Sequence, residues 1–253
     1  MNDFSDRSSP DHIEVPIDID PSGDLLLRFR DDGAGTPSLY RVSTTALRRA
    51  STYFQVLLDP LKFSEGIAVD RRLKAIRRQH GETKAIAFLE LPVIYIPDIG
   101  QVPRGVSTES AVTLFFHILH DEETSWPIPR PSFVALLAII ADRFDAATPI
   151  ARYVIQRNWK SKMVAQKGSS LMTEVRLRQQ LLIGLILRFP DWVRQYSASL
   201  IVQGSAKWTA QGEEAKEEEG LWWNFPNNLE GKVKAGQCRK ATLSFFLLLS
   251  SRF

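Results

Sequence analysis

Two histidines and a run of carboxylates near the middle of the chain are best placed, by type and spacing, to do chemistry. His117 and His120 lie three positions apart, so on a helix both imidazoles share one face. The carboxylates Asp121, Glu122 and Glu123 follow directly. Two imidazoles at this spacing could bind a metal ion, but zinc sites use three or four protein ligands. Because no cysteine or third histidine is fixed beside them, we expect two partly buried structural histidines.

Other reactive groups lack the neighbours that their chemistry requires. The Asp-Gly-Ala-Gly run at 32–35 lacks the Gly-Lys-Ser/Thr of a phosphate-binding loop, so a hairpin turn is expected there. Cys238 stands next to Arg239 and Lys240, whose charges could activate its thiol, but no histidine is close in sequence. No motif of a serine esterase or a zinc protease occurs. We therefore expect no catalytic residues, no metal and no cofactor.

A strongly basic stretch lies within residues 67–84. Its cations fall within eight positions and are Arg71, Arg72, Lys74, Arg77 and Arg78. Such a run is typical of nuclear localisation segments and of patches that bind anionic partners. Leu73 and Ile76 give the same stretch an apolar side. A solvated helix in an insertion is therefore the alternative interpretation, and the sequence leaves both open.

Composition places the chain among ordinary globular proteins. It has 253 residues, of which 44% are hydrophobic and 24% charged, with a formal net charge of +3. Its single cysteine excludes an internal disulfide framework. The N-terminal residues are acidic, and no apolar run reaches the roughly 18 residues that a membrane span needs. We therefore expect an intracellular protein of the cytoplasm or nucleus, without membrane association.

The clearest structural pattern lies between residues 40 and 66. Val42 ends an extended run, and Ser43 is a good N-cap because its hydroxyl can accept from an amide of the first helical turn. Beyond Ser43 an apolar stripe at helical spacing predicts a pair of short helices. The stripe consists of Leu47, Phe54, Leu57 and Leu58.

Strands are expected on both sides of this helix pair. Short β runs at 25–29 and 39–42 flank a turn at 31–37, which predicts a hairpin. Alternating isoleucine and valine at 13–19 predict an edge strand. A further β segment, broken by Pro92, is expected at 86–96.

Helices dominate the remainder of the chain. They are expected at 108–120, 131–144, 149–159, 171–188 and 190–203, with a polar linker at 161–170 and a last helix near Pro226. The helix at 108–120 is apolar on nearly all sides, which indicates burial. Strands gathered early and helices later indicate an α+β fold, with helices clustered against a small sheet.

This order of residues resembles the BTB/POZ domain, in which a Gly-Asp strand, a Val-Ser strand end, a helix pair and a closing Phe-x-Glu recur. The matching positions are Asp24, Val42, Leu47, Ser51, Phe54, Phe63, Glu65 and Gly66. Later segments resemble the family's next strand and helices, at 91–98, 111–119, 136–144 and 153–159. The tail at 181–191 and 223–230 is similar to that of fungal BTB-like proteins.

Three features depart from the family pattern. The basic insertion at 67–84 separates the helix pair from the next strand. Residues 121–127 replace a strand that usually follows the third helix. The end of the chain, from Gly231 onward, does not match the family's usual last helix.

The resemblance divides the chain into three regions. Residues 1–22 are expected to be an acidic, disordered N-terminus. Residues 23–160 are expected to be a BTB/POZ-like domain that carries the insertion. Residues 161–253 are expected to be a helical extension with a Glu-rich loop at 204–220.

The function that the resemblance implies is protein–protein interaction, through homodimerisation or hetero-oligomerisation. Some members are adaptors of cullin-3 ubiquitin ligases, so cullin-3 is an expected partner. The candidate partner-binding residues are Ile13, Val15, Ile17, Leu47, Phe116, His120 and Trp126. Nucleic acid is not the expected partner. The alternative hypothesis is a nuclear regulator that contacts nucleic acid or chromatin through the basic insertion.

Overall fold

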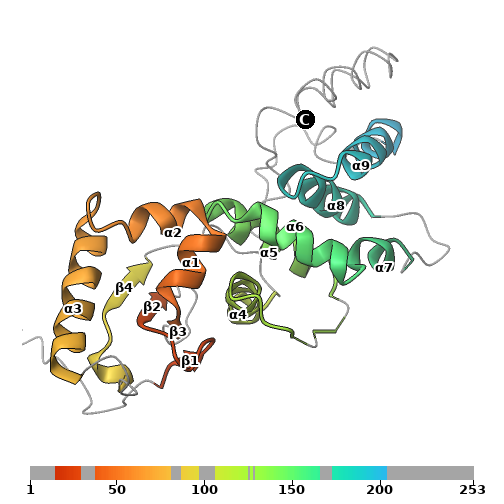
Figure 1. The fold of residues 1–253 in the computed structure, drawn as a ribbon. Helices are drawn as coiled ribbons and strands as arrows, with labels where there is room; N and C mark the ends of the chain where they lie inside the picture. Colours follow the sequence, from red (N-terminus) through yellow and green to blue (C-terminus); the bar gives the residue numbers. More distant parts are fainter. Residues whose placement is uncertain are drawn as a thin grey trace, which may run out of the picture.

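The computed structural model describes residues 15–29, 38–80, 87–96, 106–124, 126–127, 129–165 and 173–203. These residues form an α+β fold, with a small mixed sheet and a larger set of helices, as the sequence predicts (Figure 1). The expectations for residues 1–14, for the Glu-rich loop, for Cys238 and for the helix near Pro226 lie outside the described residues.

The described strands form one sheet with the order β1-β3-β2-β4. β2 (Leu25–Phe29) and β3 (Ser38–Val42) pair antiparallel, which confirms the predicted hairpin. β1 (Ile17–Asp18) pairs parallel with β3 at one edge, so the predicted edge strand is confirmed for these two residues. The disorder expected for residues 1–22 is wrong at this strand and at Ile19, which is 1% exposed. β4 (Val93–Ile96) pairs parallel with β2 at the other edge.

The β segment predicted at 86–96 is confirmed after its break at Pro92 and wrong before it. Its first part is a short 3-10 helix, η1 (Phe88–Glu90), and pairing with β2 begins only at Val93. Pro92 has no N–H to donate to a ladder, although its carbonyl oxygen accepts from Leu26 N at 2.9 Å. The chain therefore enters the sheet as a turn followed by four paired residues.

The two faces of the sheet carry separate apolar clusters. Inward side chains such as Leu25 and Tyr40 are completely buried in the main core. On the opposite face Leu26, Leu39 and Leu91 form a second, smaller cluster. The alternation of side chains along each strand produces this division.

Two short helices follow β3, as the sequence predicts. They are α1 (Thr44–Ala50) and α2 (Thr52–Leu57). Ser43 caps α1 as expected, since its Oγ accepts a hydrogen bond from an amide of the first turn. The predicted inward residues Leu47 and Phe54 are both completely buried.

Ser51 joins these two helices to each other and to the core. Its N–H donates to the carbonyl oxygen of Leu47, which ends α1, and its Oγ accepts from Phe54 N, which begins α2. The same buried hydroxyl donates to the carbonyl oxygen of Phe144, 93 positions away. A single side chain therefore fixes the junction of α1 and α2 against a distant helix end.

Gly23 and Asp24 hold the start of α1 beside the sheet. The Asp24 carboxylate accepts from the N–H and the hydroxyl of Thr44, both at 2.8 Å. An anion is favoured there because the first amides of a helix have no partner within it. A Cβ at position 23 would lie 2.6 Å from Val42 O, so only glycine fits without a shift. The Gly-Asp pair therefore has a structural explanation in this chain.

A long helix, α3 (Ser64–His80), runs beside β4 and contains most of the basic insertion (Figure 1). It begins three residues before the expected start of the insertion. Val69 and Ile76, two turns apart, are buried, and Leu73 between them is half-buried. The structure therefore confirms the helix with an apolar side that the sequence predicts.

Three further helices pack next to the sheet and the helix pair. They are α4 (Thr108–Leu119), α5 (Pro131–Arg143) and α6 (Ala147–Gln156). The prediction that the helix near 108–120 is buried on nearly all sides is confirmed. Phe115 and Phe116, on different faces of α4, are both completely buried.

The last described helices extend the same core. They are α7 (Trp159–Ala165), α8 (Glu174–Ile186) and α9 (Pro190–Gln203). The polar linker predicted at 161–170 is wrong for its first half, because α7 continues through 165 and buries Met163.

The expected boundary near residue 161 does not separate two hydrophobic cores. Figure 1 shows α8 and α9 on the far side of α5 and α6 from the sheet, and α8 packs on both α5 and α9. Leu177 and Trp192 belong to the same apolar cluster as Leu25 of β2. The helical extension and the preceding region are therefore packed together.

Left-handed residues that are not glycine end α4, α5, α6 and α8. They are Asp121, Asp145, Asn158 and Arg188, with φ between 45° and 57°. In three cases the next residue donates back to a carbonyl five positions earlier, as in Glu122 N to His117 O at 3.1 Å. This pattern is the Schellman motif, in which glycine is the usual left-handed residue.

Candidate functional site

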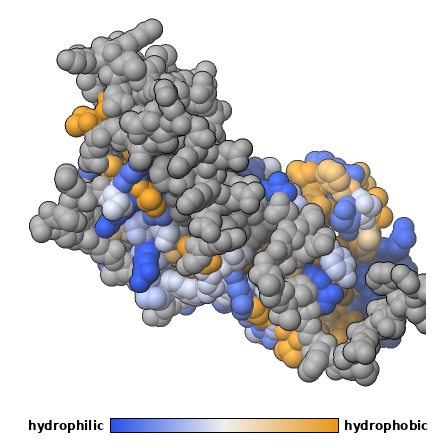
Figure 2. Space-filling model, turned by 180° about the vertical axis from the view of Figure 1, so that it is seen from behind, coloured by the Kyte–Doolittle hydropathy of each residue, from blue (hydrophilic) through white to orange (hydrophobic). Residues whose placement is uncertain are grey.

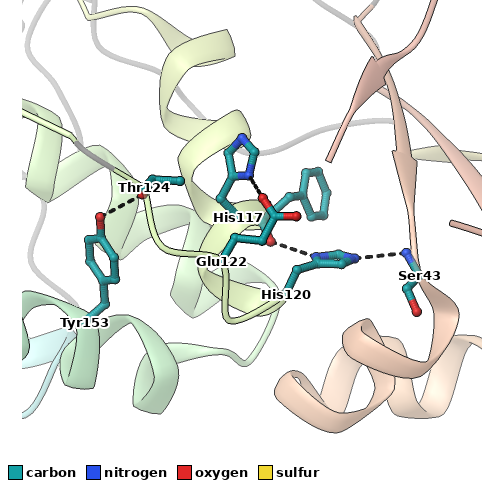
Figure 3. A network of polar contacts seen from close by, with 7 residues as sticks. Ser43, His117, His120, Glu122, Thr124 and Tyr153 are labelled. Atoms are coloured by element: carbon teal, nitrogen blue, oxygen red, sulfur yellow. Dashed lines mark hydrogen bonds and ion pairs between the residues drawn. The ribbon is translucent and has the colours of Figure 1, made fainter. Parts of the chain in front are cut away.

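Polar groups from α4, from the segment that follows it, from α6 and from the N-cap of α1 lie at the C-terminal end of α4 (Figure 3). The Schellman motif at Asp121 turns the chain sharply, so that Glu122 folds back over the last turn of α4. As a result, His117, His120 and the carboxylates at 121–123 lie close to the start of α1 and to α6. These are the residues that the sequence marks as candidates for chemistry.

His120 links the end of α4 to the start of α1. Its Nε2 accepts from Ser43 N at 2.9 Å, and its Nδ1 lies 2.8 Å from the carbonyl oxygen of Phe116. An amide can only donate and a carbonyl can only accept, so the ring is neutral with its proton on Nδ1. His120 therefore acts as a structural bridge between two helix ends.

Burial lowers the pKa of His120, because removing the imidazole from water disfavours its charged form. The bond to Phe116 O and the nearby Asp20 and Glu122 oppose this effect, and His117 adds to it. Protonation of Nε2 would also break the bond from Ser43 N. The neutral ring is thus the form that the fold stabilises.

Stability is expected to fall as the pH drops below about 6.5, the ordinary pKa of a histidine in an unfolded chain. Between this value and the lower pKa of folded His120, the unfolded state binds more protons, so acid favours unfolding. Replacement His120→Gln removes the titrating group and should flatten this part of the profile. Urea unfolding at several pH values between about 7.5 and 5 measures the effect.

His117→Gln is the matched control for this prediction. His117 lies one turn earlier on α4 and contacts Glu122 rather than Ser43. An unchanged pH profile in His120→Gln, or an equal change in both variants, would show that His120 is not the group responsible.

The two histidines do not converge on a common ligand. His117 Nδ1 pairs with Glu122 Oε2, whereas His120 bonds to Ser43 and Phe116. Within the described ranges, no group of three or more His, Cys, Asp or Glu side chains is placed to hold a metal ion. Their geometry is that of the structural histidines expected from the sequence.

The same end of the molecule carries two adjoining surface grooves. Their volumes are about 770 and 420 Å³, and both are lined by Ile118, Asp121, Pro149 and Arg152. Arg49 bonds to Asp121 at 2.6 Å, and the hydroxyls of Thr124 and Tyr153 are 3.0 Å apart. The grooves therefore offer charged groups of both signs and hydrogen-bonding groups, which suit a docking surface.

Two of the predicted partner-binding residues belong to the core instead. Leu47 and Phe116 are both 0% exposed, so neither can contact a partner without unfolding its surroundings. The prediction is wrong for them because a helical apolar stripe does not reveal whether it faces the chain's own core or another molecule.

The other predicted partner-binding residues, including the half-buried His120, keep that role as a prediction. Val15 is 75% exposed just before β1, and Ile17 is half-buried against the core. Trp126 is half-buried and stacks on Phe133, with ring centroids 6.0 Å apart. Ile13 lies outside the described residues.

The basic patch is exposed along α3. All five of its side chains reach solvent, namely Arg71, Arg72, Lys74, Arg77 and Arg78. Lys74 pairs with Asp70 at 2.7 Å, and Arg72 Nε donates to the carbonyl oxygen of Glu90. The role of the patch in nucleic-acid binding stays a prediction.

Sequence reasoning missed a group of exposed apolar side chains between residues 61 and 95. Of the ten exposed large hydrophobic side chains in the described residues, six lie here: Leu61, Phe63, Ile67, Leu89, Val93 and Tyr95. Two of them directly precede α3, one lies on α3, one lies in η1 and two lie in β4. Figure 2 shows hydrophobic residues beside hydrophilic ones at the end of the molecule where Figure 1 places α2 and α3. Of the six, only Ile67 lies in the basic insertion at 67–84, so no single sequence feature marks the group.

No protein-family model, curated protein or solved structure matches this chain. In the part of the chain that the structure describes, no helix has the length and apolar character needed to cross a membrane.

Proposed function

We propose that the chain is a protein-interaction module of the BTB/POZ type, which acts by homo- or hetero-oligomerisation. The observation that carries the proposal is the concentration of exposed apolar side chains around β4, with Leu89 69% and Tyr95 66% exposed, and this surface is assigned to a different partner protein. Single exposed apolar residues are ordinary on protein surfaces, but a contiguous group marks an interaction surface. Self-association is assigned to the β1 edge, where Val15 is 75% exposed.

The contacts of the sequence motif support the BTB/POZ part of the proposal. Asp24 binds the start of α1, Ser51 joins α1 to α2, and Gly66 lies where no side chain fits. Each of these residues thus stabilises the packing of the helix pair on the hairpin, which is the arrangement that the resemblance implies. Their roles explain why these residue types stand at these positions.

An adaptor role for a cullin-3 ubiquitin ligase is part of this proposal. The resemblance assigns cullin docking to the third helix, to the fifth helix of the domain and to the segment between them, here α4, α6 and residues 121–127. The two polar grooves lie on this surface, and the exposed Asp121 and Arg152 are among their lining residues.

Self-association is expected in size-exclusion chromatography with light scattering at micromolar concentration. The expected mass is at least twice the chain mass of 28.6 kDa. Val15→Asp places a charge beside the β1 edge and should weaken self-association by about tenfold or more, since a buried unpaired charge is costly.

Val202→Asp is the matched control, because Val202 is 83% exposed on α9, remote from the sheet. It should leave the mass unchanged. Calorimetric titration with the N-terminal region of cullin-3 tests the adaptor role in parallel. A monomer that also leaves this cullin region unbound would contradict the proposed function.

A further inference from the structure

The outer edge of β4 has backbone groups that no described residue pairs. Leu26 N donates to Pro92 O, and Leu26 lies opposite Val93 in the parallel register. In each opposite pair of a parallel ladder, one residue bonds to the neighbouring strand through its N–H and C=O. The residue opposite it directs both of these groups away from that strand. Val93 and, two residues on, Tyr95 therefore direct their N–H and C=O groups away from β2.

The paired residues of this edge strand, 93–96, carry neither charge nor proline. Edge strands are commonly shielded by charged side chains, by proline or by being very short. β1, at the opposite edge, is only two residues long. β4 instead has four paired residues, and its outward-facing positions carry a valine and a tyrosine, 41% and 66% exposed.

A groove of about 540 Å³ lies between this strand and α3. Residues 92–95 line one wall, and Glu65, Ala68, Val69 and Arg72 of α3 line the other. The volume is within the range of about 300–1,000 Å³ that is typical of ligand sites. Its mixed apolar and polar walls suit a chain segment with alternating side chains.

The two ends of the groove differ in charge. Glu65 lies at one end, whereas Arg72 is held at the η1 end by its bond to the carbonyl oxygen of Glu90, at 2.9 Å. Of the basic patch, only Arg72 lines the groove, whereas Arg77 and Arg78 are exposed further along the helix and are not among the lining residues. An occupant should therefore be acidic where it meets the η1 end and apolar toward Glu65.

We infer that the groove between β4 and α3 binds an extended, acidic segment of a partner protein, which pairs as an added strand with Val93 and Tyr95. This inference rests on the proposed function and specifies the partner for one of its surfaces. A second copy of the chain is disfavoured as occupant, because it would bring another positively charged α3 against the first. Strand addition takes its affinity from backbone hydrogen bonds and its specificity from alternate side chains.

Fluorescence anisotropy with two labelled synthetic peptides tests the inference on the full chain. Both contain an alternating valine–threonine stretch, and the acidic residues stand at the N-terminal end in one and at the C-terminal end in the other. One of them should bind, and its direction shows whether the added strand is parallel or antiparallel. A peptide with lysines in place of the acidic residues should bind at least about tenfold more weakly, and salt should reduce the difference.

Backbone pairing is tested by changing one partner at a time. Tyr95→Pro removes an outward N–H and should weaken binding about tenfold or more, whereas Tyr95→Thr keeps the N–H and should retain most of it. Equal loss in both would assign binding to the tyrosine ring and overturn the strand pairing. No loss in either would overturn the site.

A change in the peptide gives the same test without altering the protein. Methylation of the amides on one set of alternate residues should abolish binding, and methylation of the other set should not, because only one set faces β4. Equal effects of the two methylated peptides would exclude an added strand.

Light scattering of the Tyr95→Pro variant separates this inference from the proposed function. The variant should keep the mass of the wild type while losing the peptide. Wild-type oligomers that bind neither peptide would overturn the inference and leave the proposed function standing. A fall in mass in Tyr95→Pro would show that a second copy occupies the groove.

Discussion

Replacing Phe144 by alanine is expected to lower the free energy of unfolding by about 3–5 kcal/mol, the usual cost of removing a fully buried phenylalanine ring. Phe144 is 1% exposed at the end of α5. Its ring stacks on Phe54, with centroids 5.3 Å apart, and contacts Tyr53 and Phe115 at 5.2 and 5.6 Å. Alanine would leave a cavity where α2, α4 and α5 meet. Urea unfolding followed by circular dichroism measures the loss.

Phe133→Ala is the matched control for this prediction. Phe133 also belongs to α5 and also stacks on an aromatic ring, that of Trp126, but it is only half-buried. Its replacement should cost about 1–2 kcal/mol, because folding removes less of the apolar surface of Phe133 from water than of Phe144. A cost for Phe144→Ala no greater than for Phe133→Ala would show that the aromatic cluster is not the centre of the core.

The front of the fold was predictable because its signals are local. The N-cap at Ser43 needs only a hydroxyl before an apolar stripe, and the hairpin needs only two β runs around a turn. The helix ends were harder to predict. The left-handed positions hold aspartate, asparagine and arginine instead of glycine, so the usual marker of a helix end is missing from the sequence at Asp121 and Arg188.

The candidate site was only partly predictable because its contacts join residues far apart in the chain. The spacing of His117 and His120 predicted one shared helix face, but not that each ring would find its own partner. The stripe containing Leu47 predicted an apolar side, and only the packing shows that it faces the core. The exposure of Val93 and Tyr95 could not be predicted either. It depends on β4 lying at the sheet edge, which is set by its pairing with β2.

Replacing Gly66 by alanine is expected to destabilise the protein, although alanine is the better helix former by about 1 kcal/mol. Gly66 lies in the first turn of α3, which packs directly on the turn after α2. A Cβ there would lie 2.5 Å from Asp59 O and 2.9 Å from Leu57 O. Both atoms belong to the backbone, so the helix or the turn must move, at a cost of about 1–3 kcal/mol that exceeds the gain in propensity.

Ala75→Gly provides the opposite substitution on the same helix. Ala75 is exposed, so its replacement should lose about 1 kcal/mol through propensity alone. Glycine should therefore be the more stable residue at 66 and alanine at 75, as measured by urea unfolding of both variants. Because α3 is one wall of the groove beside β4, a displaced helix in Gly66→Ala should also weaken peptide binding, while Ala75→Gly should not. Stabilisation by Gly66→Ala would show that α3 is not held against the turn after α2, and the groove would then have no fixed width.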